Sequence, residues 1–276
     1  MIQNGEIVVT DDNLDKHVMH SGLVSRPMEQ YPVGGYSTSV TYGAIKDKLP
    51  LIPWADMPEL IRERVAKKMQ ISDLRATGMP DGSKVPNFHQ LNSNFCWAYS
   101  AVHGMMLSRV MGNLPFVRFS PHAIGCKIKG FRNQGGWSAH AAEFISKNGC
   151  PTVEKWPHAS WSAQNDNAAT WAEAQLYKTT EGWIDFDAPV YDRDLSKQQV
   201  LTLLLYGIPC PIDVMVLGHA MCAMDAVDAF PNKAANDPDR YGIRELDSYE
   251  NDVRVLTGRS ARPDNACGMR APLLSS

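Results

Sequence analysis

The stretch that most restricts the fold runs from Cys96 to Met111, because its side chains are apolar on most sides. A helix with that pattern has no broad polar face for water, so it predicts a helix buried in the middle of the molecule. Gly112 and Asn113 follow it and can end the helix. At 276 residues, the chain is long enough to build two lobes around such a helix.

Helices are predicted before strands along the chain. Further helices are expected at residues 57–69, 138–147, 167–177 and 196–206. Strands are expected at residues 37–42, 212–216, 219–227, 241–246 and 253–256. Asp56 and Glu59 form a capping-box pattern at the start of the first helix. The order is typical of an α+β protein, with an N-terminal extension at residues 1–80, a helical lobe at about 81–205 and a β-rich lobe at about 206–276.

The bulk composition excludes several kinds of partner. A net charge of −3 gives no electrostatic reason to expect nucleic acid. No apolar run is long enough to span a membrane, and the first residues lack the pattern of a signal peptide, so we expect a cytoplasmic or virion-associated protein without membrane contact. None of the six cysteines forms a CxxC pair, so we expect no bound metal and mostly free thiols.

Cys96 has a reason to be reactive, because it opens the predicted central helix. The unpaired backbone N–H groups at a helix N-terminus favour negative charge, and the thiolate is the nucleophilic form of cysteine. Gln90 lies six residues earlier and can supply a hydrogen-bond donor nearby. The alternative is that Cys96, which is followed by Trp97, is a small core residue.

A cysteine nucleophile needs a base, and the base needs a partner that orients it. Of the eight histidines, His219 is the best candidate, because it starts an apolar strand directly after Gly218. Asp247 ends the next strand and could accept the imidazole N–H. Taken alone, His219 could be a satisfied core histidine and Asp247 a turn residue.

Together these residues resemble the papain family (C1) of cysteine peptidases. The segments that carry the resemblance are Gln90, Cys96-Trp97-Ala98-Tyr99-Ser100, Gly135-Gly136-Trp137, Gly218-His219-Ala220 and Ala266-Cys267-Gly268-Met269. With gaps, the likeness covers roughly residues 85–272. It implies a papain-like two-lobe fold, with a helical N-terminal lobe around the central helix, a β-rich C-terminal lobe and a cleft between them.

The resemblance also implies an enzyme that hydrolyses peptide bonds without a cofactor. Cys96 would attack the peptide carbonyl, with His219 as the base and Asp247 as its orienting partner. Gln90 would donate a hydrogen bond to the oxyanion that forms. These four residues are the predicted catalytic set.

The same resemblance predicts where an extended peptide or protein substrate would bind. Gly135 and Gly136 would let the substrate backbone approach and pair alongside, and Trp137 follows them. Phe95 stands directly before the nucleophile, where the family has a small residue, and Tyr249 stands where the family has a tryptophan. Both are predicted substrate contacts, so the shape of the cleft should differ from that of the family.

Two more departures concern charge and cross-links. Asp247 stands where the family normally has asparagine. A charged acceptor should bind an imidazolium at least as well as an amide does, so the sequence alone predicts that Asp247→Asn keeps substantial activity. A bridge between Cys210 and Cys267 would resemble the last disulfide of the family, although a reducing compartment favours free thiols.

Two other functions stay open at this point. One is a papain-like scaffold without catalysis, used for binding or assembly, for example in a virion; the residues at positions 95 and 249 favour it. The other is an acyl transferase or transglutaminase-like enzyme, which uses cysteine, histidine and aspartate in the same chain order.

The extension at residues 1–80 shows one helix and lacks the longer helical pattern of an inhibitory propeptide. We therefore expect residues 1–75 to be an integral part of the protein that packs on the fold or binds a partner protein. A chain with this family likeness, no export signal and no standard propeptide is similar to compact bacterial or phage members of the family.

Overall fold

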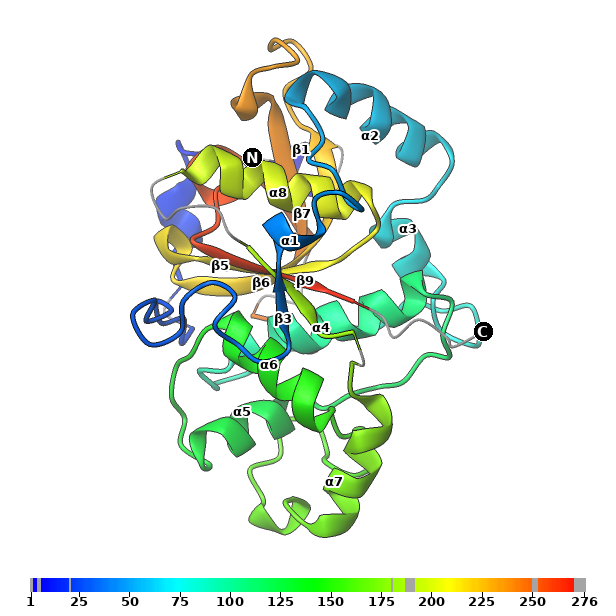
Figure 1. Ribbon diagram of the computed structural model, residues 1–276, viewed down its shortest axis with the longest axis vertical. Helices are drawn as coiled ribbons and strands as arrows, with labels where there is room; N and C mark the ends of the chain where they lie inside the picture. Colours follow the sequence, from blue (N-terminus) through cyan, green and yellow to red (C-terminus); the bar gives the residue numbers. More distant parts are fainter. Residues whose placement is uncertain are drawn as a thin grey trace.

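A computed structural model describes residues 2–3, 6–19, 21–179, 181–186, 192–249 and 253–270 of the chain. In these residues, nine strands form one mixed sheet in the order β1-β2-β8-β7-β6-β5-β9-β4-β3. Helices pack on the middle of the sheet, with α8 above it and α6 below it in Figure 1. The predicted α+β class is confirmed.

Every predicted helix and strand is present, with ends that lie within three residues of the prediction. The helices are α1 (Tyr42–Ile45), α2 (Met57–Ala66), α3 (Ile71–Ala76), α4 (Cys96–Met111), α5 (Pro121–Lys129), α6 (Ser138–Asn148), α7 (Ala168–Ala174) and α8 (Arg193–Leu205). The strands are β1 (Ile2–Gln3), β2 (Glu6–Val9), β3 (Ser39–Thr41), β4 (Trp183–Asp185), β5 (Cys210–Val214), β6 (His219–Asp228), β7 (Tyr241–Leu246), β8 (Val253–Leu256) and β9 (Asn265–Met269).

The differences from the prediction are local. Helix α5 was not predicted, although Pro121 in its first turn and the left-handed Gly130 at its end are ordinary helix signals. The predicted cap at Asp56 is wrong. A short 3₁₀ turn, Trp54–Asp56, runs directly into α2 and gives Asp56 a helical backbone. A capping residue needs an extended backbone, so the Asp56 side chain makes no cap hydrogen bond.

Helix α4 lies at the centre of the molecule (Figure 1). All of its side chains from Cys96 to Ser108 are buried. It packs on β5 and β6 of the sheet and on α5 and α6 of the helical part. Trp97 and Tyr99 are among the largest fully buried side chains. The predicted central buried helix is confirmed, and its bounds are those that the sequence indicates.

Two hydrophobic cores surround this helix and the sheet. One core joins α2 and α8 to strands β5, β6 and β7, and includes Leu201 and Ile243. The other joins α4, α5 and α6, and includes Phe119 and Trp156. Helix α4 therefore lies between a core built on the sheet, with α2 and α8 packed on it, and a core built from helices.

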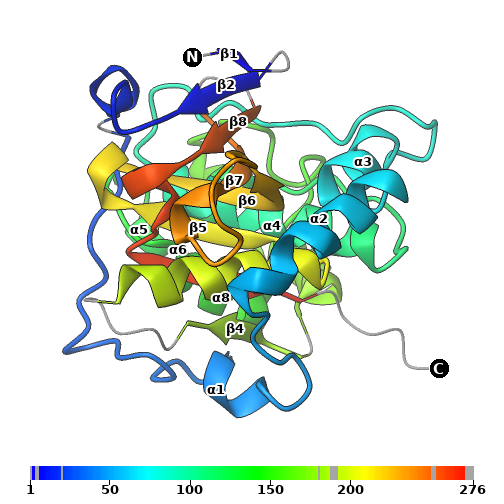
Figure 2. The same ribbon diagram turned by 90° about the horizontal axis from the view of Figure 1, so that it is seen from above.

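The N-terminal extension adds strands at both edges of the sheet. Strand β2 pairs in parallel with β8, and β3 pairs in parallel with β4. Between β2 and β3 the chain runs along one side of the molecule (blue in Figure 2). Arg26 fixes this stretch through two hydrogen bonds to the buried carboxylate of Asp185, at 2.7 and 2.8 Å. The stretch between β2 and β3 is therefore held at both ends and near its middle.

All six cysteines are free and buried. Cys210 and Cys267 therefore do not form the disulfide that the family resemblance suggested. Burial raises the pKa of both thiols well above the ordinary value, which keeps them as neutral thiols in the core. In the described ranges, no helix combines the length and the apolar character needed to cross a bilayer.

Strand β2 offers a test of whether the extension belongs to the folded core. Val9 is fully buried, while Val18 is 42% exposed. Val9→Asp should lower the free energy of unfolding by about 3 kcal/mol or more, because it places an unpaired charge in the core. Val18→Asp should change it by less than about 0.5 kcal/mol. Urea unfolding measures both, and equally small effects would show that β2 adds nothing to stability.

Candidate active site

Cys96 is the first residue of α4, and its side chain is buried. Phe95 precedes it at the N-cap position and makes no side-chain cap hydrogen bond. The backbone N–H groups of the first helical turn have no partner inside a helix. The positive end of α4 is therefore left to act on the Cys96 thiol.

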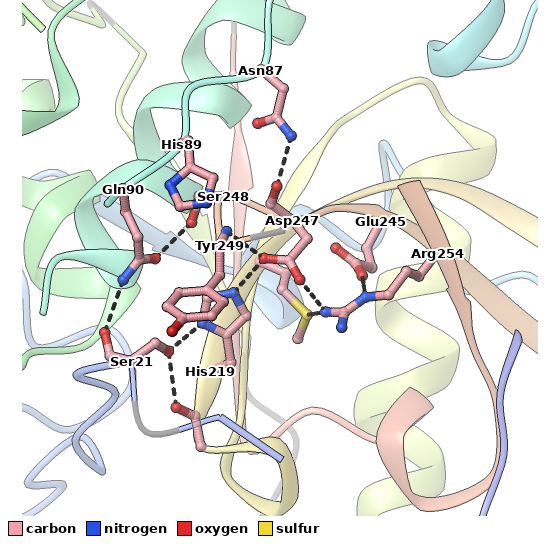
Figure 3. Close-up of polar contacts among 12 residues, drawn as sticks. Ser21, Asn87, His89, Gln90, His219, Glu245, Asp247, Ser248, Tyr249 and Arg254 are labelled. Atoms are coloured by element: carbon pink, nitrogen blue, oxygen red, sulfur yellow. Dashed lines mark hydrogen bonds and ion pairs between the residues drawn. The ribbon is translucent and has the colours of Figure 1, made fainter. Parts of the chain in front are cut away.

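His219 is the first residue of β6, and the left-handed Gly218 turns the chain into the strand. Its Nε2 lies 2.7 Å from Oδ1 of Asp247, which directly follows β7 (Figure 3). Both side chains are fully buried. Cys96 lies near enough to His219 to help raise the pKa of the imidazole. The structure thus brings together three predicted residues from α4 and from two neighbouring strands.

The charges in this group stabilise one another. Burial alone would lower the pKa of His219, but the charge of Asp247, the hydrogen bond with it and the neighbouring Cys96 raise that pKa to about 10. Burial alone would raise the pKa of Asp247, but His219 and Arg254 lower it to about 2. The site therefore holds an imidazolium against a carboxylate throughout the neutral pH range.

Gln90 is fully buried and is held by Ser248, the residue after Asp247 (Figure 3). The Gln90 backbone N–H donates to the Ser248 carbonyl at 2.7 Å, and the Ser248 hydroxyl donates to Gln90 Oε1 at 2.8 Å. With its oxygen engaged, the amide turns Nε2 to the other side. Nε2 donates to the carbonyls of Ser93, at 2.7 Å, and Ser21, at 3.2 Å. The Gln90 amide is therefore a fixed donor.

A segment of the extension lies across these residues. We call residues 21–24 the strap. The Ser21 hydroxyl contacts Nδ1 of His219, the ring nitrogen that does not face Asp247 (Figure 3). The Ser21 carbonyl accepts the hydrogen bond from Gln90. Ser21 therefore contacts two groups that were predicted to be catalytic, the His219 ring and the Gln90 amide.

The strap also pairs with the double-glycine segment. The Gly136 N–H donates to the Gly22 carbonyl, and the Val24 N–H donates to the Gly136 carbonyl, both at 2.9 Å. These bonds form a parallel β-bridge centred on Leu23. Close contact requires glycine on both sides. Gly22 has a φ of 96°, and a Cβ added at Gly135 would overlap the Gly22 carbonyl.

The other predicted substrate contacts lie at different depths. Tyr249 is 43% exposed, and its ring stands edge-on to that of His219, with 6.5 Å between the centroids. Trp137 is nearly buried, and its indole N–H donates to the hydroxyl of Tyr36 at 2.8 Å. Phe95 is completely buried in the helical core. The structure places Tyr249 beside His219 but leaves Phe95 no surface for a substrate.

A pocket of about 470 Å³ opens beside Gln90. Its walls include Ser93, His122, Asn133 and Trp161, so amide, hydroxyl and aromatic groups all face it. None of the strap residues is among those that line this pocket. In the part of the chain that the structure describes, no group of three or more His, Cys, Asp or Glu side chains could hold a metal ion.

The fold is similar to that of solved cysteine proteases. Xylellain, a cysteine protease from Xylella fastidiosa, is 14% identical with a TM-score of 0.50, over 67% of this chain and 82% of that chain. A structure from work on the mite allergens Blo t 1 and Der p 1 is 11% identical (TM-score 0.48, covering 68% and 67%). The ragweed pollen cysteine protease Amb a 11 in its proform is 12% identical (TM-score 0.49, covering 68% and 64%).

No protein-family model and no curated protein matches the sequence. At 14% identity, the similarity to xylellain establishes the fold and leaves the activity to be tested. The predicted papain-like two-lobe fold is thereby confirmed.

Arg254, Ser248 and Ser21 are among the residues that contact the catalytic set and were not predicted from the sequence. The sequence did contain a signal for Arg254, because a charged residue inside an apolar strand needs a buried partner of opposite charge. Ser248 gave only its position beside Asp247. Ser21 gave none, because its contact with His219 joins residues that lie 198 positions apart.

The raised pKa of His219 makes a prediction about stability. A group with a raised folded pKa stabilises the protein below its unfolded value, near 6.5, and loses that effect as pH rises through the folded value of about 10. The difference in unfolding free energy between the unmutated protein and His219→Gln should fall, by the order of a few kcal/mol, between about pH 6.5 and pH 10.

His122 is the matched control, because burial lowers its pKa to about 4. Its neutral form is favoured in the fold, so the effect of His122→Gln should change below pH 6.5 and stay constant above it. Urea unfolding at several pH values checks both variants. A His219→Gln effect that does not depend on pH would contradict the charged state described above.

Proposed function

We propose that this protein is a cysteine peptidase that hydrolyses peptide bonds. The observation that carries the proposal is the convergence of four polar groups from separate segments at the N-terminal end of α4. These groups are Cys96, His219, Asp247 and Gln90. A helix-end thiol beside a fixed imidazolium and a fixed amide donor is suited to acyl transfer.

The chemistry follows from the roles of the two ring nitrogens. Nε2 of His219 is engaged by Asp247, so Nδ1 is the nitrogen that can exchange a proton with Cys96. The Cys96 thiolate attacks the peptide carbonyl carbon, and Nδ1–H protonates the leaving amine as the C–N bond breaks. Neutral His219 then takes a proton from water, which attacks the thioester and releases the acid.

The oxyanion of each tetrahedral intermediate needs donors that are already in place. We assign this role to the Gln90 amide and the backbone N–H of Cys96. The Ser21 carbonyl supports the assignment, because it is a peptide oxygen that already accepts a bond from Gln90. One such donor is typically worth about 3 kcal/mol of barrier.

In this structure the strap uses the groups that a substrate would need. Ser21 engages Gln90 and His219, and Gly22 and Val24 engage Gly136. A substrate can therefore bind only when the strap has moved away. We infer that the conformation described here is a latent one.

The same observation favours a second candidate function. A protein whose cleft is permanently filled by its own chain would be a papain-like scaffold for binding or assembly. The two candidates differ in one respect that can be measured, which is whether the Cys96 thiol reacts.

The first test of the peptidase proposal is labelling with a thiol-directed epoxide peptide in reducing buffer. Burial raises the pKa of Cys126, Cys150, Cys210, Cys222 and Cys267, so these thiols should stay unreactive. Mass spectrometry should find the label on Cys96 alone. Cys96→Ala should abolish labelling with the fold intact, and Cys126→Ala should not. A protein that remains unlabelled at Cys96 with the strap released would leave only the scaffold function.

The second test releases the strap. Val24→Pro removes the N–H that donates to Gly136 and leaves the catalytic residues unchanged. Labelling of Cys96 should become several-fold faster, because one hydrogen bond that holds the strap is lost, worth about 1 kcal/mol. Val24→Ala keeps the N–H and should behave like the unmutated protein. Equal rates in all three proteins would show that the strap does not limit access.

A further inference from the structure

We propose that Arg254 is a positioning residue for the candidate catalytic group, and that it matches the charge of Asp247 so that a carboxylate can serve where an amide would otherwise be needed. The inference rests on the proposed peptidase function. Arg254 pairs with Glu245 and Asp247, so we expect its effect on the reaction to pass through Asp247 and His219.

The contacts of Arg254 are set by the sheet. Arg254 of β8 lies directly opposite Glu245 of β7 in the antiparallel register. Its Nε donates to Glu245 Oε1 at 2.8 Å, and its Nη2 lies 2.5 Å from Asp247 Oδ2 (Figure 3). Its Nη2 also lies 3.4 Å from the sulfur of Met221 on β6. All three charged side chains are fully buried.

This arrangement divides the two oxygens of Asp247 between two partners. Oδ1 accepts from His219 Nε2 and from the backbone N–H of Tyr249, both at 2.7 Å. Oδ2 faces Arg254. Two hydrogen bonds on Oδ1 and the ion pair at Oδ2 restrain the carboxylate, which in turn fixes the orientation of the His219 ring.

The charges also depend on one another. A fully buried carboxylate is costly unless a cation pairs with it. Asp247 has two cations, His219 on one side and Arg254 on the other, and Arg254 is shared with Glu245. Burial raises the pKa of Glu245 to about 7 despite the nearby Arg254. A Glu245 carboxyl with a raised pKa neutralises Arg254 only in part, so Arg254 keeps positive charge to stabilise the carboxylate of Asp247.

Other ionisable groups around this pair come from α4 and from the loop after β7. Cys96 of α4 lies near enough to His219 to influence its pKa. His103 of α4 lies within electrostatic reach of Asp247, but burial lowers its pKa to about 3 and keeps it neutral. Tyr249 packs edge-on against the His219 ring. None of these groups replaces Arg254 as a cation at Oδ2.

The geometry reverses the expectation that asparagine is tolerated at position 247. An amide whose oxygen accepts from His219 must turn its NH₂ toward Arg254, where two donors would face each other. The guanidinium, without the carboxylate of Asp247, would also repel the imidazolium. Replacing Arg254 with glutamine in the same protein removes that charge and supplies an amide oxygen that can accept from the NH₂ of the introduced asparagine. Positions 247 and 254 must therefore change together.

The test is a double-mutant cycle made in the 276-residue chain carrying Val24→Pro. The variants are Asp247→Asn, Arg254→Gln and the two combined. The sign of the Arg254→Gln effect should reverse: it should slow labelling of Cys96 when residue 247 is aspartate and speed it when residue 247 is asparagine. The combined coupling should reach about tenfold, which is within the range for residues in one buried network. Arg254→Lys should restore part of the rate lost in Arg254→Gln.

The pKa of His219, measured by NMR titration in the same proteins, separates positioning from general loss of stability. It should be lower in Asp247→Asn than in the double variant, because only the single variant keeps the guanidinium without the carboxylate. Arg244→Gln is the control, since Arg244 pairs with Asp225 and Glu6 on the same sheet, away from His219. It should lower the melting temperature and leave the pKa of His219 unchanged.

The outcomes are distinct. The role of Arg254 would be overturned if the effects of Asp247→Asn and Arg254→Gln simply added in the double variant, for both the labelling rate and the pKa of His219. It would also be overturned if Arg244→Gln shifted the pKa of His219 as much as Arg254→Gln does. Absence of labelling in every protein would overturn the peptidase function instead. In that case the NMR cycle still decides whether Arg254 sets the charge of the His219–Asp247 pair.

Discussion

The enclosure of α4 is the constraint on which the candidate site depends. The helix has no polar face, so the sheet and the helical core must both cover it. Once it is covered, the helix is fixed against β6. His219 is the first residue of β6, and Asp247, which follows the neighbouring β7, bonds to it. Cys96 therefore owes its position to rigid elements, which hold reacting groups more accurately than a loop could.

Local patterns predicted what is decided locally. Periodicity placed α4, β7 and β8 at their observed bounds, and the glycine before His219 indicated a rigid strand start. What could not be predicted comes from pairing between distant segments. The parallel pairing of β2 with β8, the contact of Ser21 with His219 and the approach of Arg254 to Asp247 all depend on register, which no single stretch of sequence encodes.

The strap depends on anchors outside itself. Its own contacts with Gly136, Gln90 and His219 are a few hydrogen bonds, and each contributes only about 1 kcal/mol net. The chain is tied into the sheet on both sides of it, at β2 and β3, and by Arg26. A tethered segment acts at a high effective concentration, so weak contacts suffice to fill the cleft. The same weakness would let the strap leave while β2 and β3 stay paired, which is what the proposed latent state requires.

Charge explains why aspartate stands at position 247 in this protein. A neutral amide could orient His219 without a second cation, whereas a buried carboxylate in the same place needs one. Arg254 lies in register opposite Glu245 and reaches the oxygen of Asp247 that His219 does not use. The carboxylate and the guanidinium are thus a single electrostatic unit carried on two elements. The acceptor at position 247 can be understood only together with the strand that places Arg254 behind it.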